Sequence, residues 1–141
     1  MTQAPGDNAA HRFPVSVKGV LFVDDRVVLL RNERDEWELP GGKLELDEEP
    51  DVCVVREIEE ELSLAARHPR LLDTWLYTIV PGVTVLIVTY GMAPLNGVTP
   101  VVSHEHKEVR LFDLAAVEGL PMPEGYRRSI RVWAEVLRAE R

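Results

Sequence analysis

The sequence predicts a single domain of the α/β class, with helices on both faces of a β-sheet. Short runs rich in valine, leucine and isoleucine alternate with two longer segments of helical period. The run 83–90 is apolar at most positions, which is typical of a strand covered on both faces. With 141 residues, of which 45% are apolar, the chain is long enough for one substantial core.

Two β-hairpins are predicted from pairs of strand-like runs with turn residues between them. The runs 15–23 and 26–30 are separated by Asp24-Asp25, and the runs 71–80 and 83–90 are joined by Pro81-Gly82. Two further extended pieces are expected outside the hairpins, at 37–40 and 109–112.

Two helices are predicted, one central and one at the end of the chain. From Glu48 to Leu64 there is no glycine, and Asp47 is positioned to cap the helix. Pro50, the one proline in this segment, lies in the first turn, where a missing N–H costs least. The second helix covers 124–139, with one apolar stripe formed by Tyr126, Ile130, Trp133 and Leu137.

Residues 1–12 contain Pro5, Gly6, Asp7 and Asn8 and have no hydrophobic period, so we expect a flexible lead-in there. The domain is then expected to cover residues 13–141.

Charge excludes some classes of partner. The chain has 16 lysines and arginines against 24 acidic residues, a formal charge of -8, which would repel nucleic acid polymers and anionic membranes. Its apolar runs are far shorter than the ~20 residues that span a bilayer. The lone Cys53 cannot form an intramolecular disulfide and no signal peptide is evident, so we expect a cytoplasmic protein.

The central helix concentrates acidic side chains. On a helical wheel, apolar and acidic residues form two separate arcs, Val52, Val55, Ile58 and Leu62 on one and Glu57, Glu60 and Glu61 on the other. Neighbouring carboxylates repel one another, and a solvated acidic face would be the ordinary reading of such a run. Binding of a hard cation such as Mg²⁺, which takes oxygen ligands, would explain why these carboxylates lie together.

Residues around the helix strengthen the metal hypothesis. Gly41-Gly42 permits close backbone approach and positive φ ahead of the helix, which would let a main-chain carbonyl join the metal shell. Arg56 is spaced to pair with Glu60 or with Glu48, so we expect it to orient the acids.

These residues together resemble the motif of the Nudix hydrolase family. The matching positions are Gly42, Glu48, Arg56-Glu57, Ile58, Glu60-Glu61 and Leu64. Ser63 departs from the family, which has glycine at this helix end, where serine is less comfortable in a left-handed conformation. The preceding segment 37–43 is similar to the family's usual approach to the motif.

The resemblance implies an α/β/α sandwich with a mixed β-sheet and hydrolysis of a diphosphate linkage. It implies Mg²⁺ or Mn²⁺ bound by Glu57, Glu60, Glu61 and the carbonyl of Gly42 or its neighbour. Water would attack phosphorus, with either Glu57 or Glu105 as general base. The expected substrate is a nucleoside diphosphate derivative: a nucleoside triphosphate, an oxidised deoxynucleoside triphosphate or ADP-ribose. Homodimers are frequent in the family, but the sequence alone does not decide the assembly.

Other site residues are open hypotheses from the sequence. Glu108 is a second choice after Glu105 in the polar segment 103–108, which a solvated loop would explain equally well. Trp37 would stack on a base or pack in the core. The cations expected to contact phosphate are Arg31, Arg34 and Lys43.

Two other functions compete with hydrolysis. One is a Nudix-fold sensor that binds a nucleotide or sugar phosphate without cleaving it, although such domains usually lose the motif acids. The other is an isoprenoid diphosphate isomerase, which needs additional protonating groups; Cys53, predicted within a helix, is poorly placed for that role.

Overall fold

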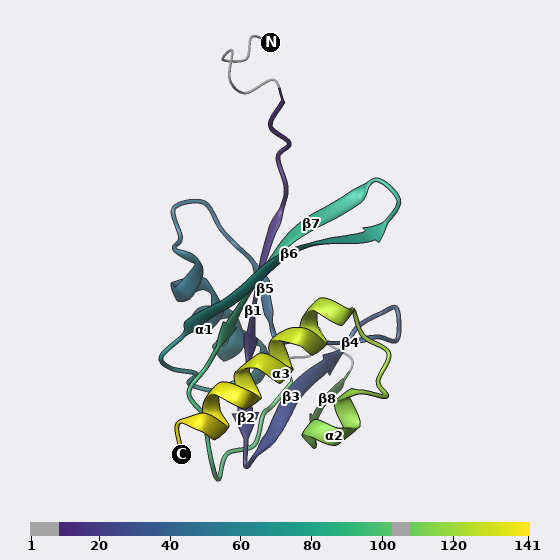
Figure 1. Ribbon diagram of the computed structural model, residues 1–141. Coiled ribbons are helices and arrows are strands. Elements are labelled where there is room, and N and C mark those ends of the chain that lie inside the picture. The colour runs from purple at the N-terminus through teal and green to yellow at the C-terminus, as the bar shows by residue number, and fades with distance from the viewer. Residues whose placement is uncertain (1–8, 103–107) are drawn as a thin grey trace.

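A mixed four-stranded sheet holds the centre of the fold. The computed structural model describes residues 9–102 and 108–141. Strand β1 (Val15–Val20) runs parallel to β7 (Val83–Gly91) and antiparallel to β5 (Gly41–Lys43), while β6 (Arg70–Val80) pairs antiparallel with β7. The order is therefore β5-β1-β7-β6, and the long β6–β7 hairpin extends from one end of the fold (Figure 1).

A second sheet is antiparallel and has β3 (Arg26–Arg31) at its centre. β3 pairs with β2 (Phe22–Val23), β4 (Trp37–Glu38) and β8 (Glu108–Phe112). The mixed sheet that the family resemblance implies is present, whereas this second sheet was not predicted as a separate one.

The first predicted hairpin is correct only at its tip. Phe22 and Val23 pair with β3 across the Asp24-Asp25 turn, whereas 15–20 pairs with β5 and β7. The apolar run 15–23 passes from one sheet to the other at Leu21, whose carbonyl accepts the Val28 N–H at 3.0 Å. A continuous run of β-forming residues does not show where a chain changes sheets.

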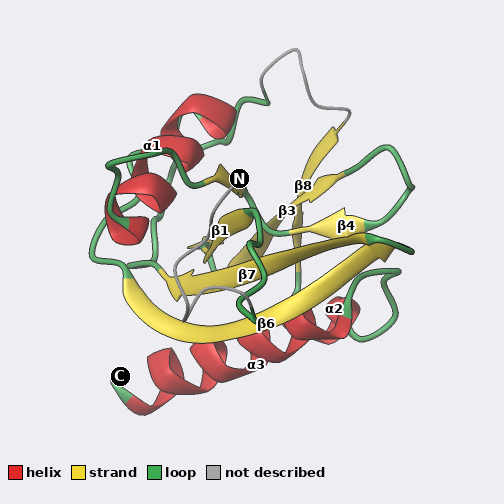
Figure 2. Ribbon diagram, turned by 90° about the horizontal axis from the view of Figure 1, so that it is seen from above, coloured by secondary structure: helices red, strands yellow, loops and turns green. Residues whose placement is uncertain are grey.

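Helices cover opposite sides of the β-structure, as expected (Figure 2). Helix α1 (Pro50–Leu62) closes one core, to which Val17, Val54 and Ile58 belong. Helix α3 (Glu124–Ala139) closes the other and buries Tyr126, Ile130 and Trp133, with Leu137 packed against it. The bounds predicted for this last helix are confirmed. A short helix, α2 (Leu114–Val117), was not predicted.

Helix α1 differs from its prediction at both ends. It begins at Pro50 after Glu49, while Asp47 takes φ 65° in the preceding turn and does not cap it. The proline fixes the start because it has no N–H to donate. At the other end, Ser63 adopts the left-handed conformation (φ 56°, ψ 36°), and its N–H donates to Glu59 O at 2.9 Å. Ser63 therefore has the left-handed backbone conformation that was expected to be less comfortable for serine than for glycine.

The apolar arc predicted for α1 is rotated in the structure. Val52 is 57% exposed, whereas Cys53 and Val54 are fully buried together with Ile58 and Leu62. The wheel placed Glu61 opposite the packed face, but Glu61 is 8% exposed. The helix packs on a face that includes this carboxylate because a backbone N–H of β5 accommodates it.

The second hairpin, around Pro81-Gly82, is confirmed with its expected turn, in which Gly82 has φ 85°. The extended pieces at 37–40 and 109–112 correspond to β4 and β8. Across the described ranges 9–102 and 108–141, no helix has both the length and the apolar character needed to cross a membrane.

Candidate functional site

The candidate site lies where α1 faces β5. Glu61, near the end of α1, is buried, and its Oε1 accepts the backbone N–H of Gly41 at 2.7 Å. A charge-assisted hydrogen bond of this kind stabilises the ionised form of a carboxylate that burial would otherwise disfavour. The side chain is therefore held against the strand by a contact that fixes one of its oxygens.

Glu57, one turn earlier in α1, lies against Gly42. A Cβ built on Gly42 would come within 2.4 Å of the Glu57 Cδ and Oε2 atoms. The absence of a side chain at residue 42 therefore leaves the space that the Glu57 carboxylate occupies. Gly41 has a different role, because its φ is 147° and an added Cβ would lie 2.0 Å from Val17 O.

Arg56 joins the acidic residues of the site. Its Nε donates to Glu48 Oε2 at 2.6 Å and its Nη2 to Glu48 Oε1 at 3.0 Å, a two-point contact. Its Nη1 lies 3.0 Å from Glu57 Oε1 and 3.1 Å from Glu60 Oε2. Both pairings predicted for Arg56, with Glu48 and with Glu60, are confirmed.

The hydrogen bond from Arg56 lowers the pKa of Glu48 from 4.5 to about 2. Because the folded state has the lower pKa, the pair stabilises the protein above about pH 4.5, and this contribution is lost as the pH falls toward 2. We expect Glu48→Gln to be less stable than the wild type at pH 7, with the difference in thermal midpoint shrinking below pH 4.5. Thermal unfolding across this range checks it, with Glu33→Gln at an exposed site as the control. A difference that stays constant with pH would contradict the assignment.

The donor set has the chemistry that Mg²⁺ or Mn²⁺ requires. Carboxylate oxygens of Glu57, Glu60 and Glu61 and main-chain carbonyls of β5 are all hard oxygen ligands. In the part of the chain that the structure describes, no three acidic, histidine or cysteine side chains are gathered closely enough to hold a metal ion. Arg56 instead neutralises Glu57 and Glu60. Glu60, with 59% of its side chain exposed, is free of the packing constraint that holds Glu61.

The other residues predicted for the site make different contacts. Trp37 is 7% exposed and packs edge-on against Phe112, with ring centroids 4.8 Å apart, so it is a core residue. Arg31 pairs with Asp35 and Glu108, and Arg34 with Glu36. Lys43 is exposed at the end of β5. Glu105 lies outside the described residues.

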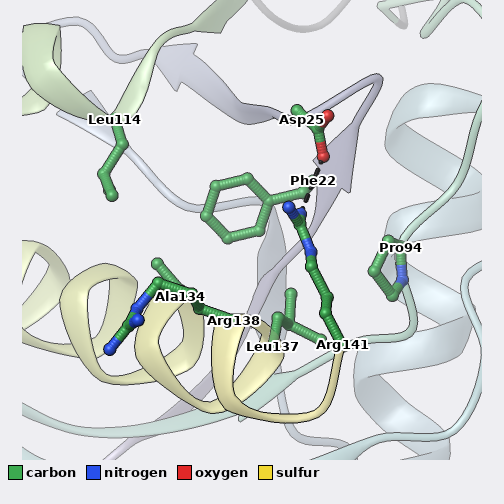
Figure 3. Close-up of a pocket in the computed structure, with 8 residues that line it drawn as sticks. All are labelled: Phe22, Asp25, Pro94, Leu114, Ala134, Leu137, Arg138 and Arg141. Carbon is green, nitrogen blue, oxygen red and sulfur yellow. Dashed lines mark hydrogen bonds and ion pairs between the residues drawn. The ribbon is translucent and has the colours of Figure 1, made fainter.

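A cavity between α3 and the Asp24-Asp25 turn is not part of the site. Figure 3 shows this cavity of about 320 Å³, where the side chain of Phe22 lies beside the ion pair between Asp25 and Arg141 (3.1 Å). Leu137 and Leu114 contribute further apolar surface. None of its described lining residues belongs to α1 or β5. A hollow of about 520 Å³ beside α1 includes Arg56 and Glu60 but neither Glu57 nor Glu61.

Sequence reasoning missed Lys18. It lies in β1, is 9% exposed, and has its ammonium 3.8 Å from Glu38 Oε2. The signal in the sequence was a single charged residue in a strand of valine, serine and glycine, because such a residue is buried if the strand is central.

Comparison with known proteins identifies the family. The model of the NUDIX domain matches residues 12–133. The chain belongs to the Nudix hydrolase family. It is 37% identical over 86 residues to a MutT-like protein of Streptomyces ambofaciens, covering 60% of this chain and 54% of that protein. It is 31% identical over 111 residues to the uncharacterized Nudix hydrolase YvcI of Bacillus subtilis, covering 75% and 70%.

The Nudix fold is also evident among solved structures. The NUDIX domain of Shewanella oneidensis NrtR, solved as a complex with ADP ribose, matches with a TM-score of 0.75 and 22% identity. The match covers 96% of this chain and 94% of that one. The predicted α/β/α sandwich with a mixed sheet is thus confirmed as the Nudix fold.

Proposed function

We propose that this protein hydrolyses the diphosphate linkage of a nucleoside diphosphate derivative in the presence of Mg²⁺ or Mn²⁺. The observation that carries the proposal is the placement of Glu57 and Glu61 against consecutive glycines of β5. A solvated acidic face would not bury one carboxylate on a backbone N–H and fit a second against a glycine. Side chains fixed in this way are suited to present oxygens to a metal and a phosphate.

Each residue of the site has a distinct proposed role. Glu57, Glu60 and Glu61 hold the metal together with the carbonyl of Gly42, and Arg56 and Glu48 orient the acids. When bound, the metal neutralises phosphate charge and lowers the pKa of water. Glu57 is a candidate general base because its carboxylate lies against Gly42 in the site. Glu105 stays a competing prediction.

Metal binding on this surface involves Arg56. Its Nη1 contacts both Glu57 and Glu60, so a divalent cation bound by these carboxylates would compete with the guanidinium for them. The two-point contact with Glu48 is separate and keeps Arg56 attached to the loop before α1. Arg56 is therefore a positioning residue for the acids.

The expected partner is a small anionic substrate. A net charge of -8 disfavours nucleic acid polymers and anionic membranes, and a divalent cation would offset it locally for a diphosphate. The substrates we propose first are nucleoside triphosphates, including oxidised ones, and ADP-ribose. The cytoplasm and a homodimer remain our expectations for location and assembly, and 13–141 for the domain.

A substrate panel tests the function. We expect phosphatase-coupled phosphate release from at least one nucleoside diphosphate derivative in Mg²⁺, and none in chelator. Mass spectrometry of the products would identify the broken linkage. Binding without turnover across the panel would favour the sensor, and conversion of an isoprenoid diphosphate into its isomer would favour the isomerase.

A further inference from the structure

Lys18 is a charged residue in a place where charge is costly. It occupies the middle of β1, between Val17 and Val20 in a strand whose described side chains are otherwise apolar or small, and is 9% exposed. Lysine is almost never fully buried unless it is paired, and moving its ammonium out of water costs several kcal/mol. The burial of this ammonium therefore has to be explained by its contacts or by its function.

Ion pairing accounts for only part of the surroundings of Lys18. The ammonium is 3.8 Å from Glu38 Oε2, longer than a hydrogen bond, so the contact does not saturate its three N–H donors. Burial lowers the pKa of Lys18, but Glu38, Tyr126, Glu61 and Glu57 together raise it above its ordinary value. The ammonium therefore stays charged, with Glu38 of β4 as its ion-pair partner.

Lys18 also lies opposite the part of β5 whose backbone contacts the acids of α1. Its Cα is paired with Gly41 across the β1–β5 ladder. The Gly41 N–H in turn donates to Glu61, and the next residue, Gly42, lies against Glu57. The proposed metal ligands and this buried cation are thus held by the same two strands.

Stability alone does not explain this arrangement. Replacing a buried ion pair by apolar side chains of similar volume is often neutral or stabilising. Val17 and Val20 show that β1 accepts apolar side chains in both cores. Methionine at position 18 would match most of the length of the lysine side chain without its charge.

We propose that Lys18 binds the diphosphate of the substrate, with its ammonium donating to a non-bridging phosphate oxygen beside the Glu57–Glu61 site. The inference rests on the proposed function, since it assigns a cation to the same diphosphate. A lysine is a compact point charge well suited to phosphate. It supplies, inside the site, a fixed positive charge for a substrate that the acidic protein as a whole repels.

The test is binding of a diphosphate that cannot be hydrolysed. Titration calorimetry with α,β-methylene-ADP, in Mg²⁺ and again in chelator, separates binding from turnover. We expect Lys18→Met to weaken binding by about 10- to 100-fold, the loss of one charge-assisted hydrogen bond. Lys18→Arg should retain part of the affinity. Lys18→Met leaves the Glu38 carboxylate without its ion-pair partner, so its thermal midpoint should be below that of the wild type, and binding is compared at a temperature at which both proteins are folded.

Controls distinguish a phosphate contact from a structural counter-charge. Arg138→Met removes an exposed cation on α3 and should leave binding unchanged. Adenosine, which has no phosphate, should bind Lys18→Met and the wild type equally. Unchanged affinity of Lys18→Met for the probe would overturn the proposal, as would equal weakening toward adenosine, or a wild type that does not bind the probe.

The proposal and the hydrolase function can fail separately. If the wild type binds the probe through Lys18 but turns over no substrate, the phosphate contact stands and hydrolysis does not. If the wild type hydrolyses a substrate and Lys18→Met has the same KM, kcat and probe affinity, the function stands and the phosphate contact is wrong.

Discussion

Replacing Glu61 by glutamine should lower kcat on the order of 10²-fold or more while the fold is kept. Glutamine has nearly the same shape and still has an amide oxygen to accept the Gly41 N–H, which Glu61 now accepts at 2.7 Å. It lacks the negative charge with which Glu61 would attract a divalent cation. We therefore expect the thermodynamic cost of folding to be small, about 1 kcal/mol, and the catalytic cost to be large.

Steady-state kinetics and calorimetric titration with Mn²⁺ check the Glu61→Gln prediction together. Glu59→Gln is the matched control, because it removes the same charge from an exposed position on the same helix. We expect weaker Mn²⁺ uptake and low kcat in Glu61→Gln only. Wild-type turnover in that variant would refute the metal assignment, and absence of Mn²⁺ or Mg²⁺ uptake by the wild type would refute the metal-dependent mechanism.

The contacts of Arg56 within the candidate site were predictable because they depend on residue type and spacing. Glu60 follows Arg56 by four residues on one helix, so the two side chains can meet whichever face of the helix is packed. Periodicity also predicted α3 and the hairpin at Pro81-Gly82, where local pattern and turn chemistry agree.

Features that depend on tertiary contacts were not predictable in the same way. The rotation of α1 depends on Glu61 finding the Gly41 N–H, a contact between residues 20 positions apart. The crossing of 15–23 between sheets depends on a parallel pairing with β7, far along the chain. Trp37 is a similar case, since only the position of Phe112 shows that its ring is in the core. Long-range pairing therefore determined each of these outcomes.

Gly42→Ala should inactivate the enzyme without unfolding it. The new Cβ would lie 2.4 Å from two atoms of the Glu57 carboxyl group and 2.7 Å from a third. These atoms are at the end of a flexible side chain, so rotation of Glu57 relieves the overlap at small cost to folding, about 1 kcal/mol. The carboxylate then leaves the position from which it would act, and kcat should fall on the order of 10²-fold.

Two other glycines make the Gly42→Ala experiment selective. At Gly119 an added Cβ would lie 4.0 Å from Ala116 O, an ordinary contact, so Gly119→Ala should keep both activity and thermal midpoint. At Gly41 the Cβ would meet the rigid backbone of β1 and the φ of 147° is unfavourable, so Gly41→Ala should lower the thermal midpoint. If Gly42→Ala lowers the thermal midpoint as Gly41→Ala does, glycine is needed at residue 42 for the structure of β5. If kcat falls and the thermal midpoint does not, glycine is needed at residue 42 to leave space for the Glu57 carboxylate.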